Sequence, residues 1–178
     1  MTATAYIVLF RGVGGATQLP VKRLREVLSD AGFGHVSTYI NSGNAVLSSS
    51  LDEAGVAMQV AGIVRKSLGF EKHVLVRSRE DWAAAIADNP FPDVTDEPTK
   101  FHVYALEREP ADEDVARLNA KAVGTERFNV KGRTLYLHTP DGMGGSAFAP
   151  KIEPTLKLAA TARNWRTVLA LDEMARAI

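Results

Sequence analysis

A basic side chain followed by glycines lies near the start of the chain. Arg11 follows the apolar run Tyr6–Phe10 and precedes Gly12, Gly14 and Gly15. Backbone N–H groups in a glycine-rich turn can converge on an anion, and the start of a following helix adds partial positive charge. These residues predict an anion-binding nest. The alternative is that the glycines only turn the chain, while Arg11 pairs with a carboxylate.

Two further polar groups have residue types suited to ligand binding. Asn41, Ser42 and Asn44 offer two amides and a hydroxyl within one short turn, although the same residues are common turn formers. Arg163 and Asn164 precede the last amphipathic stretch, where the arginine can reach an anion and the asparagine can cap a helix. The alternative for this pair is a purely structural cap beside a surface or lobe-bridging charge.

Arg11 and Arg163 each stand where an apolar element meets a helix start. We therefore hypothesise that both line one cleft between two lobes. The function predicted from the residues is binding of a small phosphate- or carboxylate-bearing ligand, and whether catalysis follows is left open. Two alternatives remain, an RNA-binding module and a scaffold without a small ligand.

Several catalytic and cofactor motifs are missing from the sequence. The stretch Gly12–Thr17 has threonine where a dinucleotide fingerprint has its third glycine, and the strands after it form a hairpin rather than a parallel crossover. No Gly-Lys-Ser/Thr marks a P-loop, and Ser42 lacks a nucleophile-elbow context. The chain has no cysteine, which excludes disulfides and thiolate chemistry. We therefore predict no cofactor.

The histidines and the acidic loop give no metal signal. No two histidines share a metal-ligand spacing; they are His35, His73, His102 and His138. The carboxylates of the 93–97 run match no oxygen-ligand loop and predict a solvated segment. We predict no metal site.

Charge and hydropathy narrow the remaining function classes. Lysine plus arginine and aspartate plus glutamate number 21 each, so the formal net charge is zero. Proteins that bind nucleic-acid backbone usually carry a basic excess, and nucleic acid is disfavoured as a partner. No apolar run approaches the roughly 20 residues of a membrane span, so we expect a cytoplasmic protein without a membrane partner. No heptad pattern is long enough to indicate a coiled coil, and the oligomeric state stays open.

Hydrophobic periodicity predicts how these groups are positioned. In the first half it predicts strands over 5–10, 35–40, 45–48 and 73–77, with helices over 20–31 and from a Ser50 capping box to about 68. The order β-α-β-β-α-β is ferredoxin-like. In the second half it predicts helices from 79, over 110–123, over 152–158 and after Asn164, with strands over 101–106, 128–130 and 134–138. The fold class is therefore α+β, with two ferredoxin-like lobes, 1–78 and 79–178, each with an antiparallel sheet and helices on one face.

Two of these strands carry histidine and tyrosine on alternate positions. His102 and Tyr104 share one face of their strand, and Tyr136 and His138 share one face of theirs. If the two strands pair with these faces together, the four side chains cluster. The alternative is a sheet face that is solvated or covered by a helix.

Several motifs together resemble a family of proteins known as domain of unknown function 1697. The resemblance rests on motifs spread along the whole chain: Leu9–Gly12 with its glycines, Thr38–Asn44, Asn89–Phe91, Leu137–Gly142, and Ala160–Trp165 with Thr167. It implies a two-lobed α+β fold built from ferredoxin-like units, and no established reaction. The chain departs from the family pattern in its first turn, which is shorter and lacks an asparagine. It also departs at Met143–Phe148, where family members often carry basic residues.

Overall fold

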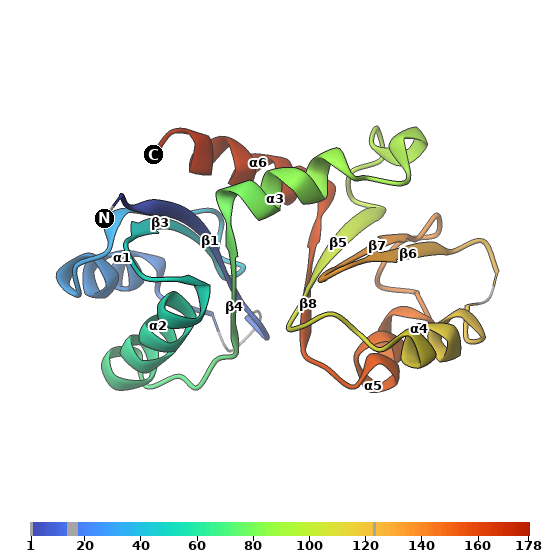
Figure 1. Cartoon of the computed structure of the whole chain (residues 1–178), viewed down its shortest axis with the longest axis horizontal. Helices are drawn as coiled ribbons and strands as arrows, with labels where there is room; N and C mark the ends of the chain where they lie inside the picture. The colour runs from blue at the N-terminus through green and yellow to red at the C-terminus, as the bar shows by residue number, and fades with distance from the viewer. Residues whose placement is uncertain (1, 14–17, 123) are drawn as a thin grey trace. The chain divides into compact units, whose positions relative to one another are not determined.

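The computed structural model describes residues 2–13, 18–122 and 124–178, and the contacts divide the chain into two compact units (Figure 1). Unit 1 is Met1–Ile86 with Leu169–Ile178, and unit 2 is Ala87–Val168. The division of folding units at 78–79 stays a prediction. Within the described ranges, no helix is long and apolar enough to cross a membrane.

Unit 1 contains a four-stranded antiparallel sheet in the order β2-β3-β1-β4. The chain order is β-α-β-β-α-β, as predicted for a ferredoxin-like unit, and a helix follows β4. The elements are β1 (Thr4–Phe10), α1 (Val21–Asp30), β2 (Gly34–Thr38), β3 (Asn44–Ser49), α2 (Glu53–Leu68), β4 (Val74–Ser78) and α3 (Arg79–Ala87).

Unit 2 repeats this order around a second antiparallel sheet, β6-β7-β5-β8. The α+β fold of two ferredoxin-like lobes is thereby confirmed. The elements are η2 (Pro92–Val94), β5 (Phe101–Leu106), α4 (Asp112–Asn119), β6 (Arg127–Lys131), β7 (Thr134–His138), η3 (Ala149–Lys151), α5 (Ile152–Leu156), β8 (Ala160–Asn164) and α6 (Trp165–Arg176), whose last turns belong to unit 1.

Each sheet buries one face under its helices. In unit 1 the alternate β1 residues Tyr6, Val8 and Phe10 join α1 and α2 side chains in one core, as the 3.6-residue spacing of Leu24 and Leu28 predicts. In unit 2 the corresponding core combines residues of β5 and β7 with residues of α4 and α5. Burial of these apolar faces holds the strands in a fixed register.

The registers of the central strands agree in the two sheets, whereas β2–β3 has an irregularity between Gly34 and Ser37 that β6–β7 lacks. Ile7 of β1 pairs with Arg77 of β4, and Val103 of β5 pairs with Arg163 of β8. In both edge strands the arginine is followed by one residue that caps the next helix. Ser78 Oγ accepts from Asp81 N at 3.1 Å, and Asn164 Oδ1 accepts from Thr167 N at 3.0 Å. The chain is therefore a structural duplication, which the order of elements had indicated.

Two details differ from the sequence-based prediction. The α2 cap is Asp52, whose Oδ1 accepts from Gly55 N at 2.8 Å, so the predicted Ser50 cap is wrong. Glu53 Oε1 accepts from Ser78 N of β4 at 3.0 Å. Strand β8 was not predicted, because Ala160–Asn164 has neither β-branched alternation nor a long apolar run.

The histidine and tyrosine faces in unit 2 do not coincide. His102 is paired with Leu137, and Phe101 is paired with His138. Residues directly opposite each other share a face, so the His102 face is the helix-covered one that contains Leu135 and Leu137. His138 and Tyr136 lie on the other face. The cluster of four is thus excluded by the register.

Candidate functional site

The end of β1 turns a corner against two other segments of unit 1. Phe10 N donates to Gly43 O at 2.9 Å, and Arg11 N donates to His73 O at 2.9 Å. These bonds continue the β1 ladder beyond the last paired residues of β3 and β4. They bring together the first turn, the tip of the β2–β3 hairpin and the approach to β4, and we call this place the β1 corner.

The first turn presents polar groups to solvent at this corner. Arg11 and Gly12 are exposed, and Gly12 has φ +73°, a conformation that glycine adopts without strain. Lys72 Nζ donates to Gly12 O at 2.7 Å and so places an ammonium group beside the turn. Gly14 and Gly15 lie outside the described residues, so the anion nest predicted from them stays a prediction.

The hairpin tip meets the corner through tight packing. A Cβ on Gly43, whose φ is +79°, would lie 2.9 Å from Val13 Cγ2 and 3.0 Å from Phe10 O. Asn44 is almost fully buried, and its Nδ2 donates to Tyr39 O at 3.2 Å and to Ser42 Oγ at 3.1 Å. Of the polar residues predicted here, Asn41 is exposed, whereas Asn44 and Ser42 bond to each other within the turn.

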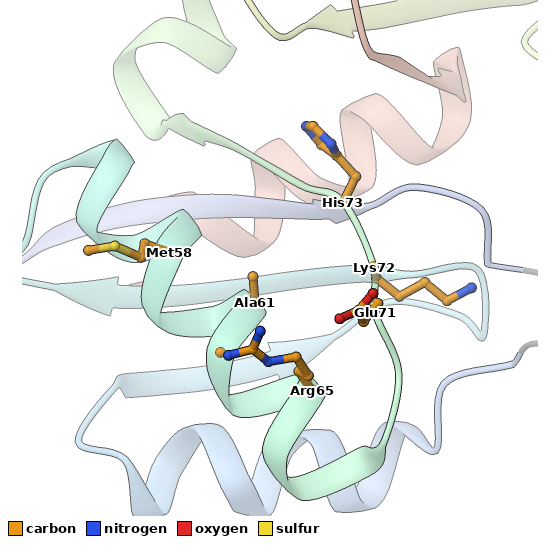
Figure 2. Close-up of a pocket in the computed structure, with 7 residues that line it drawn as sticks. Met58, Ala61, Arg65, Glu71, Lys72 and His73 are labelled. Carbon is orange, nitrogen blue, oxygen red and sulfur yellow. The ribbon is translucent and has the colours of Figure 1, made fainter.

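An open cavity of about 480 Å³ lies next to the corner, between α2 and the approach to β4 (Figure 2). The residues that line it include Met58, Ala61, Arg65, Glu71, Lys72 and His73. Figure 2 shows Arg65 on α2 and Lys72 on the approach to β4, with the Lys72 side chain directed away from Arg65. Among the residues that the structure describes, Arg65 and Glu71 form no ion pair.

The cavity combines two kinds of surface. Met58 is 75% exposed and, with Ala61, gives an apolar side on the outer turns of α2. Arg65 and Lys72 give a cationic side, which also holds the His73 ring and one carboxylate, that of Glu71. This arrangement can hold a molecule that has an anionic group at one end and an apolar part at the other.

Arg65, Glu71 and Lys72 were missed in the sequence analysis. The stretch from Gly69 to His73 was interpreted only as the end of a helix and the start of a strand. The available signal was a charged run, Glu71-Lys72, at the point where a strand enters the sheet beside the glycine-rich turn. Its proximity to Gly12 depends on the β1–β4 pairing, which no local pattern specifies.

Arg163 and Asn164 belong to unit 2, where both have local partners. Arg163 Nη1 donates to Thr161 Oγ1 and to Ala162 O, each at 2.8 Å, and burial lowers the Arg163 pKa to about 10. Asn164 caps α6 through Thr167 N, as its position before the helix predicted. That Arg11 of unit 1 and Arg163 of unit 2 line one cleft stays a prediction.

Unit 2 builds the same corner after β5 with different side chains. Leu106 N donates to Arg133 O at 2.9 Å, and Glu107 N donates to Ala159 O at 2.9 Å, as Phe10 and Arg11 do in unit 1. In this β5 corner Glu107 Oε2 accepts from Ala159 N at 3.2 Å and from Arg108 Nη1 at 3.3 Å. At the position that the exposed Arg11 occupies in unit 1, unit 2 thus has Glu107, whose carboxylate already accepts hydrogen bonds.

Comparison with known proteins identifies a family and a fold. A family model described as "Protein of unknown function (DUF1697)" matches residues 3–136. Among solved structures, a conserved bacterial protein from Streptococcus pneumoniae is similar in fold. It has 21% identity and a TM-score of 0.69 over 98% of this chain and 99% of that chain.

A second solved structure aligns much more weakly. The small subunit of acetolactate synthase from Thermotoga maritima aligns over 92% of this chain and 98% of that chain, at 14% identity and a TM-score of 0.25. That likeness is too weak to bear on fold or function. No curated protein matches the sequence.

Proposed function

This chain belongs to the DUF1697 family of proteins of unknown function, and on that premise we propose that unit 1 binds a small anionic ligand at the β1 corner. The ligand carries a phosphate or carboxylate group. It also has an apolar or planar part that lies along α2. Arg65 and Lys72 bind the anionic group, and Arg11 adds positive charge at the edge of the site.

The observation that carries this proposal is the difference between two corners built on one backbone pattern. In the β5 corner the residue after the central strand is Glu107, whose carboxylate accepts two hydrogen bonds from its own unit. In the β1 corner the corresponding residue is the exposed Arg11, with the ammonium of Lys72 and an open cavity beside it. The residue after the central strand is thus a hydrogen-bonded carboxylate in unit 2 and a cation with a second cation beside it in unit 1.

The charges that line the cavity favour an anion over a cation. Two cations, Arg65 and Lys72, and one carboxylate, that of Glu71, line the cavity. Arginine binds phosphate and carboxylate oxygens in a bidentate manner, whereas lysine acts as a mobile point charge. Glu71 disfavours large polyanions and can accept a hydrogen bond from a ligand hydroxyl or amine, which favours small polar metabolites.

Thermal unfolding of the full chain in the presence of ligands tests the proposal. The panel contains inorganic phosphate, pyrophosphate, sugar phosphates, nucleotides and carboxylic acids. A ligand at ~100 times its dissociation constant adds about 2.7 kcal/mol to the free energy of unfolding. For a chain of this size we expect the Tm to rise by several degrees, at roughly 2–4 °C per kcal/mol.

Variants locate any binding that the panel detects. We expect Arg65→Gln and Lys72→Met each to reduce the Tm shift caused by the ligand to less than about half. The matched control is Arg108→Gln in the β5 corner, where the arginine bonds Glu107 and Lys157 O within its own unit. The proposal is wrong if no ligand shifts the Tm, or if the shift is unchanged in both unit 1 variants.

A further inference from the structure

The sheet of unit 2 has one face that α4 and α5 do not cover, where Trp165 of α6 packs on Phe101 with ring centroids 5.0 Å apart. Helices α4 and α5 pack on the face that contains Tyr104, Leu135 and Leu137. The opposite face contains Phe101, Tyr136 and His138, because neighbouring residues along a strand point to opposite sides. We call this second surface the open face because α4 and α5 leave it uncovered, although Phe101, Tyr136 and His138 are buried there.

The segment between α3 and β5 lies over part of this face (Figure 1). The Phe91 ring meets the Phe101 ring edge-on with their centroids 6.3 Å apart, and the Arg127 guanidinium lies 4.8 Å above Phe91. Lys131 Nζ donates to Asp88 O at 2.7 Å. Residues 88–97, which we call the strap, are thus tied to β5 and β6 by side chains.

Beneath and beside the strap, His138 has no hydrogen-bond partner. It is 7% exposed, and among the described residues neither Nδ1 nor Nε2 has a partner. Its cross-strand neighbours are Arg127 on β6 and Phe101 on β5. A buried imidazole without partners costs free energy, so an unfilled hydrogen-bonding position at this place needs an explanation.

The charged groups around His138 form two ion pairs, and the strap supplies the carboxylate of each pair. Arg127 Nη2 lies 2.8 Å from Asp93 Oδ2, and Lys100 Nζ lies 2.8 Å from Glu97 Oε1. Both carboxylates come from the strap, whereas both cations flank the open face. All four charges act on the imidazole. Burial is the main reason that the His138 pKa is lowered; Arg127 and Lys100 lower it further, whereas Asp93 and Glu97 raise it.

We propose that His138, Arg127 and Lys100 form an oxyanion-binding site on the open face, and that Asp93 and Glu97 of the strap fill it from within the chain. The ligand is a phosphate or carboxylate group. Without the ligand, the two strap carboxylates form the ion pairs with Arg127 and Lys100 that the ligand would form. The incoming oxyanion displaces them and accepts the hydrogen bond that His138 does not make otherwise.

The exposure of the ion pairs makes this exchange feasible. The side chains are 44% and 62% exposed in the Arg127–Asp93 pair, and 39% and 48% exposed in the Lys100–Glu97 pair. Solvent-exposed pairs contribute little to stability, so a competing oxyanion has only a small cost to overcome. The proposal concerns unit 2 alone and does not depend on the β1 corner.

The test uses the histidine resonances of the full chain. Inorganic phosphate is titrated at pH 7 and constant ionic strength, and the His138 imidazole is followed by ¹H–¹⁵N NMR with His138→Gln for assignment. In Asp93→Asn/Glu97→Gln we expect the phosphate concentration at the midpoint to fall by about tenfold relative to the unmodified chain. Asp96→Asn removes one negative charge from the same exposed segment and is the matched control, with an expected change below about twofold.

Two further variants decide between outcomes. Arg127→Gln, added to the double variant, should raise the midpoint again by about tenfold, and Lys100→Gln replaces it if that protein does not fold. Lys72→Met, in unit 1, should leave the His138 titration unchanged. The proposal is overturned if the His138 resonance does not respond to phosphate in the double variant, or if its midpoint stays within about twofold of Asp96→Asn.

Discussion

The β1 corner and the β5 corner share a backbone and differ in chemistry. Each is fixed by two hydrogen bonds that extend the central strand, from Phe10 and Arg11 in unit 1 and from Leu106 and Glu107 in unit 2. Beyond these bonds the side chains diverge. The first corner is glycine-rich and basic, whereas the second is closed by a hydrogen-bonded carboxylate.

The hairpins that reach the two corners also differ in length. Five residues, 39–43, join β2 to β3, whereas two residues, Gly132 and Arg133, join β6 to β7. The longer tip places Gly43 against Phe10 and Val13. A duplicated sheet therefore fixes where a corner lies, while the turn length and a few side chains decide whether it can hold a ligand.

The largest effect is expected at the contact between the hairpin tip and the first turn. Gly43→Ala would put a Cβ 2.9–3.1 Å from atoms of Val13 and Phe10, at a φ of +79°. We expect the free energy of unfolding in urea to fall by about 3 kcal/mol, from strain at positive φ together with overpacking.

Gly132 is the matched control for this substitution. It has φ +55°, but a Cβ there would meet nothing within 4 Å. Gly132→Ala should therefore cost only about 1 kcal/mol, which is the conformational part alone. Equal losses in the two variants would show that the close approach in unit 1 contributes nothing to the corner.

A fall in pH should destabilise unit 2 through His102, whose Nδ1 is buried. His102 corresponds in register to Tyr6, whose OH donates to Leu51 O at 2.7 Å, but His102 Nδ1 is buried without a partner among the described residues. Burial lowers the His102 pKa from 6.5 to about 4. As the pH falls below 6.5 the unfolded chain binds the proton first, so stability is lost between pH 6.5 and about 4.

Urea unfolding at pH 7 and pH 4.5 measures this loss. The part that depends on His102 should be about 2 kcal/mol, because one unit of pKa shift corresponds to about 1.4 kcal/mol. His102→Gln cannot take up the proton and should show a correspondingly smaller change between the two pH values. An identical change in both proteins would mean that the folded chain protonates His102 as easily as the unfolded chain does.

The two helix caps at corresponding positions allow a smaller and more specific comparison. Removing the cap by Ser78→Ala or Asn164→Ala should cost about 1 kcal/mol in each case, measured by thermal unfolding. Asn164→Asp keeps an acceptor for Thr167 N and should retain most of the stability. If Asn164→Asp folds normally but weakens anion binding, Asn164 has a role in a ligand site beyond its cap.

The fold could be predicted from the sequence because local patterns and global topology agree in it. Strand β1 is an unbroken apolar run, α1 has helical spacing, and α2 ends at Gly69 in the left-handed conformation. Strand β8 lacked such a signal. Strand β8 is defined by its pairing with β5, which lies more than 50 residues earlier in the sequence.

The candidate site could be predicted only in part, for a related reason. Glycine and arginine mark the first turn locally, so Arg11 and Gly12 could be proposed from the sequence. Asn44 was predicted as a ligand residue and stays a prediction; its amide donates to Tyr39 O and Ser42 Oγ within the turn. Lys72 reaches the site through a hydrogen bond across 60 positions of sequence, and contacts at that separation leave no periodic pattern.

Lys72→Met should change the free energy of unfolding least and ligand binding most. Lys72→Met removes an exposed contact with Gly12 O and should alter the free energy of unfolding by less than about 0.5 kcal/mol. Glu107→Ala, at the β5 corner, removes an acceptor for Ala159 N and should cost about 1 kcal/mol.

Anion binding should show the opposite order for these two variants. The Tm shift caused by a ligand should be lost in Lys72→Met, because the ammonium lies at the cavity, and kept in Glu107→Ala, because that carboxylate serves only the closed corner. A Glu107→Ala protein that gained a second binding event would show that the β5 corner is the same site held shut. If neither variant altered binding, the ligand would have to lie away from both corners, and the difference between them would be one of packing alone.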